Sequence, residues 1–216
     1  MYNNTSLDTL CAALCKIADV NAPGTANSPE ETLTEYAANI FGGEKADRIF
    51  MYNPDAVAQW IYEKYPHLMK EATDRTELKV PFRTVMPSVT PVCFGTMYTG
   101  AQPAVHGIQK YEKPVIKIET IFDMFIKAGK KPVIIADKNC SIANIFLERD
   151  MDYFRYDNYE QVNAKAQSLS LRTSTIFMSY ITETTILLCT STAPKVQKHF
   201  PSFVQIPAPS VCLMSL

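Results

Sequence analysis

Short apolar segments alternate with amphipathic segments along most of this chain, and no other feature limits its possible folds as strongly. Arg48–Asn53 and Lys131–Ala136 are apolar and bordered by turn-forming residues, as buried strands are. Glu119–Ala128, by contrast, repeats its apolar residues with the period of a helix and stops at Gly129. Strands and helices that alternate at such short spacing build βαβ units. The sequence therefore predicts an α/β fold, in which a mainly parallel sheet is flanked by helices.

Further elements are expected on both sides of these segments. A helical period predicts a helix over Ser6–Val20, and Ser28 is expected to cap a second helix that ends near Gly42. The remaining patterns predict strands at Lys113–Lys117 and Met151–Tyr156, and helices at Asp55–Tyr65, Ser141–Glu148 and Asn158–Leu169. We expect three parts: an N-terminal helical segment over residues 1–45, an α/β domain over 46–168 and a different tail over 169–216.

Composition excludes several classes of partner. With 47% hydrophobic and 20% charged residues, the chain can bury a substantial core. A net charge of -1 gives no reason to expect nucleic acid or an acidic membrane surface. The N-terminus lacks the pattern of a signal peptide, and no apolar run is long enough to cross a bilayer. The six cysteines include no CxxC pair, so reduced thiols in a cytoplasmic protein are expected.

Thr84–Ile108, TVMPSVTPVCFGTMYTGAQPAVHGI, carries the clearest motif. Thr90 is expected to be the N-cap of a helix whose first residue is Pro91 and which Gly100 ends. The Thr90 hydroxyl then lies at the positive end of the helix dipole, where phosphate and carboxylate groups bind readily. A capped core helix with no chemistry has the same local pattern, and the spacing alone leaves both interpretations open.

The segment PSVTP, followed by TG, a proline and HGI, resembles the nucleophile block of the alkaline phosphatase superfamily. It is most similar to the type I phosphodiesterase and nucleotide pyrophosphatase branch, and the likeness is specific over about 25 residues. In that family a hydroxyl bound to one of two zinc ions attacks phosphorus and forms a covalent phosphoryl enzyme. The resemblance implies an incomplete alkaline phosphatase-like α/β domain that acts on a small-molecule phosphoester or nucleotide.

The resemblance also implies roles for individual residues. Thr90 becomes the nucleophile and a metal ligand, with Ser88 as the fallback, and the helix amides after Thr90 are expected to help hold the phosphoryl oxygens. Asp55, at the end of the first strand, becomes the first metal ligand, although an aspartate there also suits a helix N-cap. Cys93 stands where the family often has an asparagine that touches the phosphate. His106, in HGI, is given a structural role and not a metal.

A two-zinc site needs about six Asp and His ligands. This chain has three histidines, and no D-H pair or HxxxH spacing. We therefore expect the zinc site to be incomplete, with Asp55 and Thr90 as its candidate ligands. Two functions stay open: a zinc-assisted phosphodiesterase or nucleotide pyrophosphatase, and a truncated, catalytically inactive product. A serine hydrolase is disfavoured because the sequence has no GxSxG motif.

The composition changes from Leu169 onward. Of the 22 acidic residues only Glu183 lies in this tail, and none of the 7 glycines does. Without Gly, Asn or Asp the tail lacks the residues that form tight turns, so a βαβ domain is not expected to continue through it. A back-translation of the tail, read two bases later from about Ser170, can spell a strand, an aspartate, three residues and a histidine. That resembles the next metal-ligand block of the superfamily, and we hypothesise an out-of-frame tail.

The nucleotide sequence tests this hypothesis. We expect its codons, read in the shifted frame from about Ser170, to encode acidic residues and glycines and to continue without an early stop. A shifted frame that yields neither would refute the frame slip, and the tail would then belong to the protein as encoded.

Overall fold

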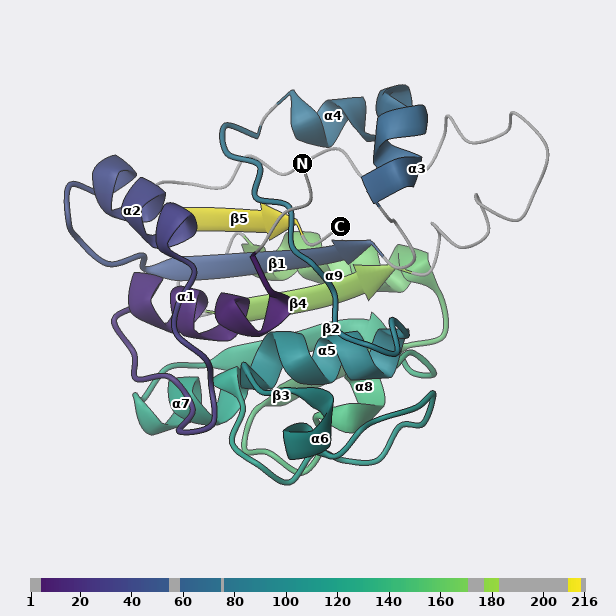
Figure 1. Ribbon diagram of the computed structural model, residues 1–216. Coiled ribbons are helices and arrows are strands. Elements are labelled where there is room, and N and C mark those ends of the chain that lie inside the picture. The colour runs from purple at the N-terminus through teal and green to yellow at the C-terminus, as the bar shows by residue number, and fades with distance from the viewer. Residues whose placement is uncertain (1–4, 55–58, 75, 171–176, 183–209, 215–216) are drawn as a thin grey trace.

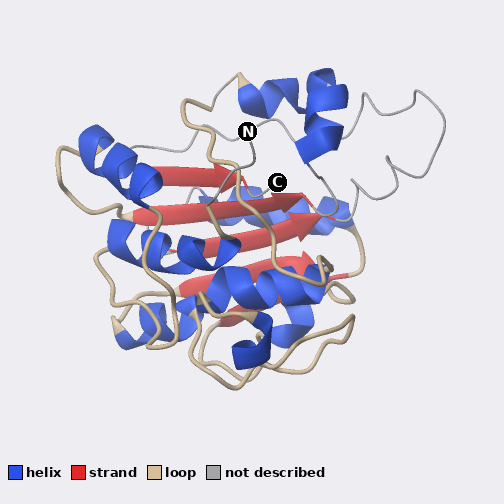
Figure 2. Cartoon of the chain, viewed as in Figure 1, coloured by secondary structure: helices blue, strands red, loops and turns tan. Residues whose placement is uncertain are grey.

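The computed structural model describes residues 5–54, 59–74, 76–170, 177–182 and 210–214, and its centre is a parallel sheet (Figure 1, Figure 2). The described strands lie in the order β3-β2-β4-β1-β5, and all neighbouring pairs are parallel. Their bounds are Arg48–Pro54 (β1), Pro132–Asp137 (β2), Asp152–Tyr156 (β3), Phe177–Thr182 (β4) and Ser210–Met214 (β5). The mixed α/β architecture with a parallel sheet, expected from the alternating pattern, is confirmed.

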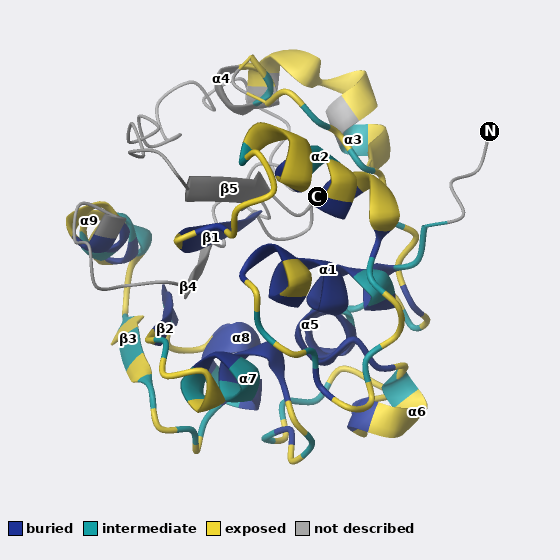
Figure 3. Cartoon of the chain, turned by 90° about the vertical axis from the view of Figure 1, so that its left-hand side faces the viewer, coloured by how far each residue is buried: buried dark blue, intermediate teal, exposed yellow. Residues whose placement is uncertain are grey.

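Helices cover both faces of the sheet, but unequally. Helices α1, α5, α7 and α8 lie on one face, and α9 lies on the other (Figure 3). The described helices are η1 (Leu7–Thr9), α1 (Leu10–Ile17), α2 (Glu31–Ile40), α3 (Gln59–Lys64), η2 (Pro66–Met69), α4 (Lys70–Thr73), α5 (Thr90–Thr99), α6 (Pro103–His106), α7 (Ile121–Lys127), α8 (Ile142–Ile145) and α9 (Tyr159–Ser170). Helix α3 carries Trp60, the only tryptophan of the chain, with 60% of its surface exposed.

Alternate residues of each strand face the two helical layers, as the pleat requires. In β1, Ile49 and Met51 belong to the larger core under α1 and α5, whereas Phe50 between them belongs to the smaller core under α9. In β2, Ile134 and Ile135 divide in the same way. The central residues of both strands, 49–52 and 133–136, are therefore apolar on both faces, which explains why the sequence shows them as continuous apolar runs.

Two segments of the tail are strands of this sheet. Strand β4 lies between β2 and β1, and β5 lies beside β1 at one edge (Figure 1). The sequence led us to expect that the α/β domain does not continue past residue 168, and that boundary falls inside α9. The described parts of the tail thus contribute backbone pairing to the domain.

Two local expectations are wrong. The N-cap of α2 is Glu30 and not Ser28, because the Glu30 side chain, and not the serine, accepts the Leu33 amide. Lys113–Lys117 is not a strand, because the backbone of Ile116 bonds to the end of helix α8 and to the Arg149 side chain and not to a neighbouring strand. The Ile116 amide donates to the carbonyl of Ile145, for example, at 2.8 Å.

Arg149 holds this irregular segment in place. Its side chain is 6% exposed, and its Nε lies 2.9 Å from Oδ2 of Asp123. Its Nη2 donates to the carbonyl oxygens of Ile116 and Ile118, at 3.0 and 3.3 Å, and Nη1 donates to that of Leu147. One guanidinium therefore ties the segment before α7 to α7 itself and to the loop after α8.

Replacing Arg149 should destabilise the fold strongly. Arg149→Met leaves Asp123 and three carbonyls without this donor, and we expect it to lower the free energy of unfolding by about 3 kcal/mol. Arg149→Lys should recover only part of the loss, because an ammonium cannot reproduce the fork of donors. Arg155→Met is the control, since Arg155 is exposed, and it should cost less than about 1 kcal/mol. Urea denaturation of the variants measures these differences, and equal effects at 149 and 155 would contradict the assignment.

Candidate functional site

Helix α5 begins at the carboxyl edge of the sheet. Figure 1 shows its first turn at the end where the arrowheads of β1, β4 and β2 lie, and from there it runs back along the sheet. Open parallel sheets bind their ligands at this edge, because strand ends and helix starts meet there. Thr90 is the first residue of α5 and is partly exposed. The structure therefore brings Thr90 to the edge at which the strand before Asp55 ends.

Thr90 is not the helix cap. The N-cap of α5 is Val89, in an extended conformation, and no side chain caps the helix. Helical hydrogen bonding begins one residue earlier than expected, because the Val89 carbonyl accepts the amides of both Val92 and Cys93, at 3.0 Å each. Thr90 is thus the first residue of α5, within its positive first turn, and not the residue before the helix.

The same hydrogen bonds limit what the first turn can offer an anion. Pro91 has no N–H, and the Val92 and Cys93 amides already donate to Val89. The expectation that the amides after Thr90 hold phosphoryl oxygens is therefore not supported by their geometry. What remains favourable to an anion at this end of α5 is the helix dipole.

Asp55 lies outside the described residues, so its role as a metal ligand stays a prediction. Strand β1 ends at Pro54, and Asn53 just before it is buried. Ser88, the fallback nucleophile, is exposed, and its hydroxyl accepts a hydrogen bond from that of Thr84 at 3.2 Å. Cys93 is half-buried, one turn along α5 from Thr90.

His106 is a buried, neutral histidine with both ring nitrogens hydrogen-bonded. The Ile108 amide donates to its Nδ1 at 3.3 Å, so Nε2 carries the proton and donates to the Thr96 hydroxyl at 3.1 Å. Burial lowers the pKa of His106 from 6.5 to about 4. Each nitrogen that could bind a metal is therefore occupied by the protein itself, and the imidazole joins α6 to α5.

Two glycines, Gly95 within α5 and Gly100 at its end, allow close approaches to this helix. A Cβ on Gly95 would lie 2.6 Å from Cε1 of His106, so only glycine lets the ring approach the helix. Gly100 ends α5 with φ of 69°, and a Cβ there would lie 2.6 Å from that of Ala26. The expected helix end at Gly100 is confirmed.

Two of the other polar candidates, Asp137 and His67, have identified contacts within the protein. Asp137, at the end of β2, accepts the Asn139 amide at 2.8 Å and so shapes its own turn. His67 is exposed in η2 and packs edge-on against Tyr65, while His199 lies outside the described residues. Within the described ranges, no three His, Cys, Asp or Glu side chains gather as a metal site would require.

No described helix has the length and hydropathy needed to cross a membrane.

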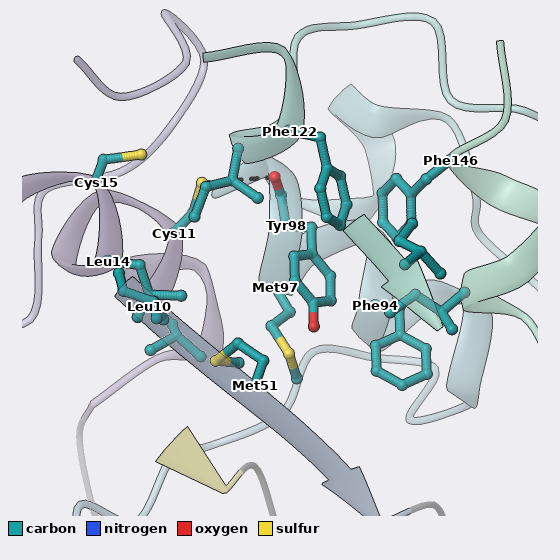
Figure 4. Close-up of a cluster of buried hydrophobic side chains, with 14 of the residues drawn as sticks. Leu10, Cys11, Leu14, Cys15, Met51, Phe94, Met97, Tyr98, Phe122 and Phe146 are labelled. Atoms are coloured by element: carbon teal, nitrogen blue, oxygen red, sulfur yellow. Dashed lines mark hydrogen bonds between the residues drawn. The ribbon is translucent and has the colours of Figure 1, made fainter. Parts of the chain in front are cut away.

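One contact at this edge was missed by the sequence analysis. The Asn53 side-chain amide donates to the Tyr98 hydroxyl at 3.1 Å, and both residues are fully buried. The Tyr98 ring lies against Phe122 and Phe146, with Phe94 nearby (Figure 4). The sequence does show a polar residue, Asn53, directly after the apolar residues of β1. It contains no pattern that identifies Tyr98 as the partner of this residue.

No known family, curated protein or solved structure matches this chain in comparisons of sequence and fold.

The neutrality of His106 should make stability depend on pH. Between about pH 6.5 and pH 4 the unfolded chain binds a proton at this residue and the folded chain does not. The free energy of unfolding should therefore fall as pH is lowered through this window, by up to about 1.4 kcal/mol per pH unit. The difference in stability between wild type and His106→Gln, measured by urea denaturation from pH 7 to pH 4, isolates this contribution.

The control for this measurement is His67→Gln. Because His67 is exposed in η2, this change should leave the wild-type slope in place. If His106→Gln shows the same dependence of the free energy of unfolding on pH as the wild type, other groups cause that dependence.

Proposed function

We propose that this chain is, by ancestry, a metal-dependent phosphoester hydrolase similar to phosphodiesterases and nucleotide pyrophosphatases, with an alkaline phosphatase-like fold. The observation that carries the proposal is the position of Thr90. This partly exposed hydroxyl residue begins a ten-residue helix at the carboxyl edge of a parallel sheet, the edge at which the strand that precedes Asp55 also ends (Figure 1). The PSVTP…TG…HGI spacing supports the same assignment.

The reaction class requires a nucleophile that can carry the phosphoryl group. A hydroxyl attacks phosphorus while the bond to the leaving oxygen breaks, and water later releases the phosphoryl group. Thr90 suits the first role because it is partly exposed and lies at the positive end of α5, which favours the negative phosphoryl group. A small-molecule phosphodiester or nucleotide is the proposed substrate.

Zinc fits the described residues poorly. In the superfamily two zinc ions supply Lewis acidity and bind the nucleophile. Of the candidate ligands, Thr90 is described and Asp55 is not, while the ring nitrogens of His106 are already hydrogen-bonded. These candidates provide too few ligands for two zinc ions, so the steps above are described for the residues of the chain alone.

The same observation supports the second candidate function. If the missing ligands belong to a second half that this chain does not encode in frame, the protein retains the fold and the nucleophile segment but is catalytically inactive. Measured zinc content separates the two. Close to two ions per chain, found by elemental analysis after dialysis against zinc, supports the hydrolase, and none supports the inactive product.

Activity tests Thr90 directly. We expect hydrolysis of bis-p-nitrophenyl phosphate with added zinc to exceed that of p-nitrophenyl phosphate. Thr90→Ala should lower kcat/KM at least about a hundredfold, because it removes the atom that bonds to phosphorus. Ser88→Ala is the matched control, two residues away and exposed, and should leave turnover near that of wild type.

Three other outcomes are informative. Turnover that survives Thr90→Ala would remove Thr90 from the mechanism. If Ser88→Ala abolishes turnover and Thr90→Ala does not, Ser88 is the nucleophile. A wild-type protein that binds no zinc and hydrolyses neither ester would establish the inactive alternative.

A further inference from the structure

We propose that the hydrogen bond between Asn53 and Tyr98 sets the separation between the carboxyl end of β1 and helix α5, which makes Tyr98 a positioning residue for the candidate site. Asn53 is the second residue before Asp55, and Tyr98 lies two turns along the helix that begins at Thr90. The proposal rests on the proposed function for its catalytic meaning, but the contact itself does not depend on that function.

Burial makes this contact specific. Asn53 is 1% exposed and Tyr98 is 0% exposed, so neither polar group can exchange its partner for bulk water. A buried amide or hydroxyl that loses its partner is strongly disfavoured, and small displacements of the strand end away from the helix are therefore opposed. The Phe122 ring stacks on Tyr98 at 5.2 Å and the Phe146 ring meets it edge-on at 5.3 Å, which fixes the direction of the hydroxyl.

Helix geometry explains why a residue so far along α5 acts at the strand end. Long side chains in a helix lean toward its N-terminus. Because α5 starts at the carboxyl edge, the Tyr98 side chain leans back toward that edge and meets Asn53 there. The bond thus links helix α5, which begins at Thr90, to strand β1, which ends at Pro54. Because a displacement of the reacting groups by about 1 Å can slow a reaction strongly, a bond that fixes the distance between these elements affects catalysis.

Amide hydrogen exchange tests the contact without any need for activity. In Tyr98→Phe, which keeps the ring and removes the hydroxyl, exchange should be about fivefold faster in peptides covering 48–54 and 90–99. Tyr153→Phe is the control, because it removes a tyrosine hydroxyl that is hydrogen-bonded elsewhere: it donates to the Phe146 carbonyl at 2.8 Å, from β3 at the far edge of the sheet. It should leave both peptides unchanged. Equal exchange in the two variants would overturn the proposal.

A second variant guards against general destabilisation. Asn53→Leu keeps the branched shape and the number of heavy side-chain atoms and removes the donor. The double variant Asn53→Leu/Tyr98→Phe should exchange no faster in these peptides than Tyr98→Phe alone. Additive effects would show that the two side chains act independently, and would refute the link.

Kinetics separate positioning from stability. In bis-p-nitrophenyl phosphate hydrolysis, Tyr98→Phe should lower kcat about tenfold with KM unchanged, whereas Tyr153→Phe should lower the melting temperature and leave kcat unchanged. Faster exchange in Tyr98→Phe with an unchanged kcat would overturn the positioning role. A wild-type protein without turnover would instead refute the proposed function, and the exchange comparison would then decide the inference by itself.

Discussion

The described sheet is continuous because β4 pairs on both of its sides. All six of its residues are in register with β1 on one side and the first four with β2 on the other, and so β4 joins the pair β3-β2 to the pair β1-β5. These are backbone interactions, which depend little on which side chains a strand carries. A segment with few acidic residues and no glycine can therefore supply the central strand, provided that its residues favour extended backbone, as Phe177–Thr182 does.

The sequence could predict those parts of the fold whose cause is local. Strands β1 and β2 are buried on both faces and so appear as unbroken apolar runs, and α7 carries both its Thr120 cap and its terminal Gly129. Strands β4 and β5 escaped prediction because the tail lacks the turn residues that mark strand ends. Lys113–Lys117 was mistaken for a strand because apolar spacing cannot tell a ladder from a loop whose carbonyls bond to Arg149.

The candidate site divides in the same way. Pro91 and Gly100 predicted the bounds of α5: its end is confirmed, and its start at Thr90 is one residue earlier than predicted. The contact of Asn53 with Tyr98 spans 45 residues, and that of Thr96 with His106 needs a glycine one residue earlier in α5 to let the ring approach. Such pairs form only when the helices pack, and no local sequence pattern predicts which residues then meet. Local sequence patterns therefore predict that Thr90 lies at the start of a helix, whereas the contacts around the candidate site depend on tertiary packing.

The exposure of Trp60 has a practical consequence for following the unfolding of this protein. Indole emission responds to the solvent around the ring, and this ring, on α3, is already largely in water in the folded state. Its spectrum will change little when the core around Phe122 and Tyr98 comes apart. Near-ultraviolet circular dichroism of the buried tyrosine and phenylalanines, and not tryptophan fluorescence, is the optical signal that follows loss of tertiary structure here.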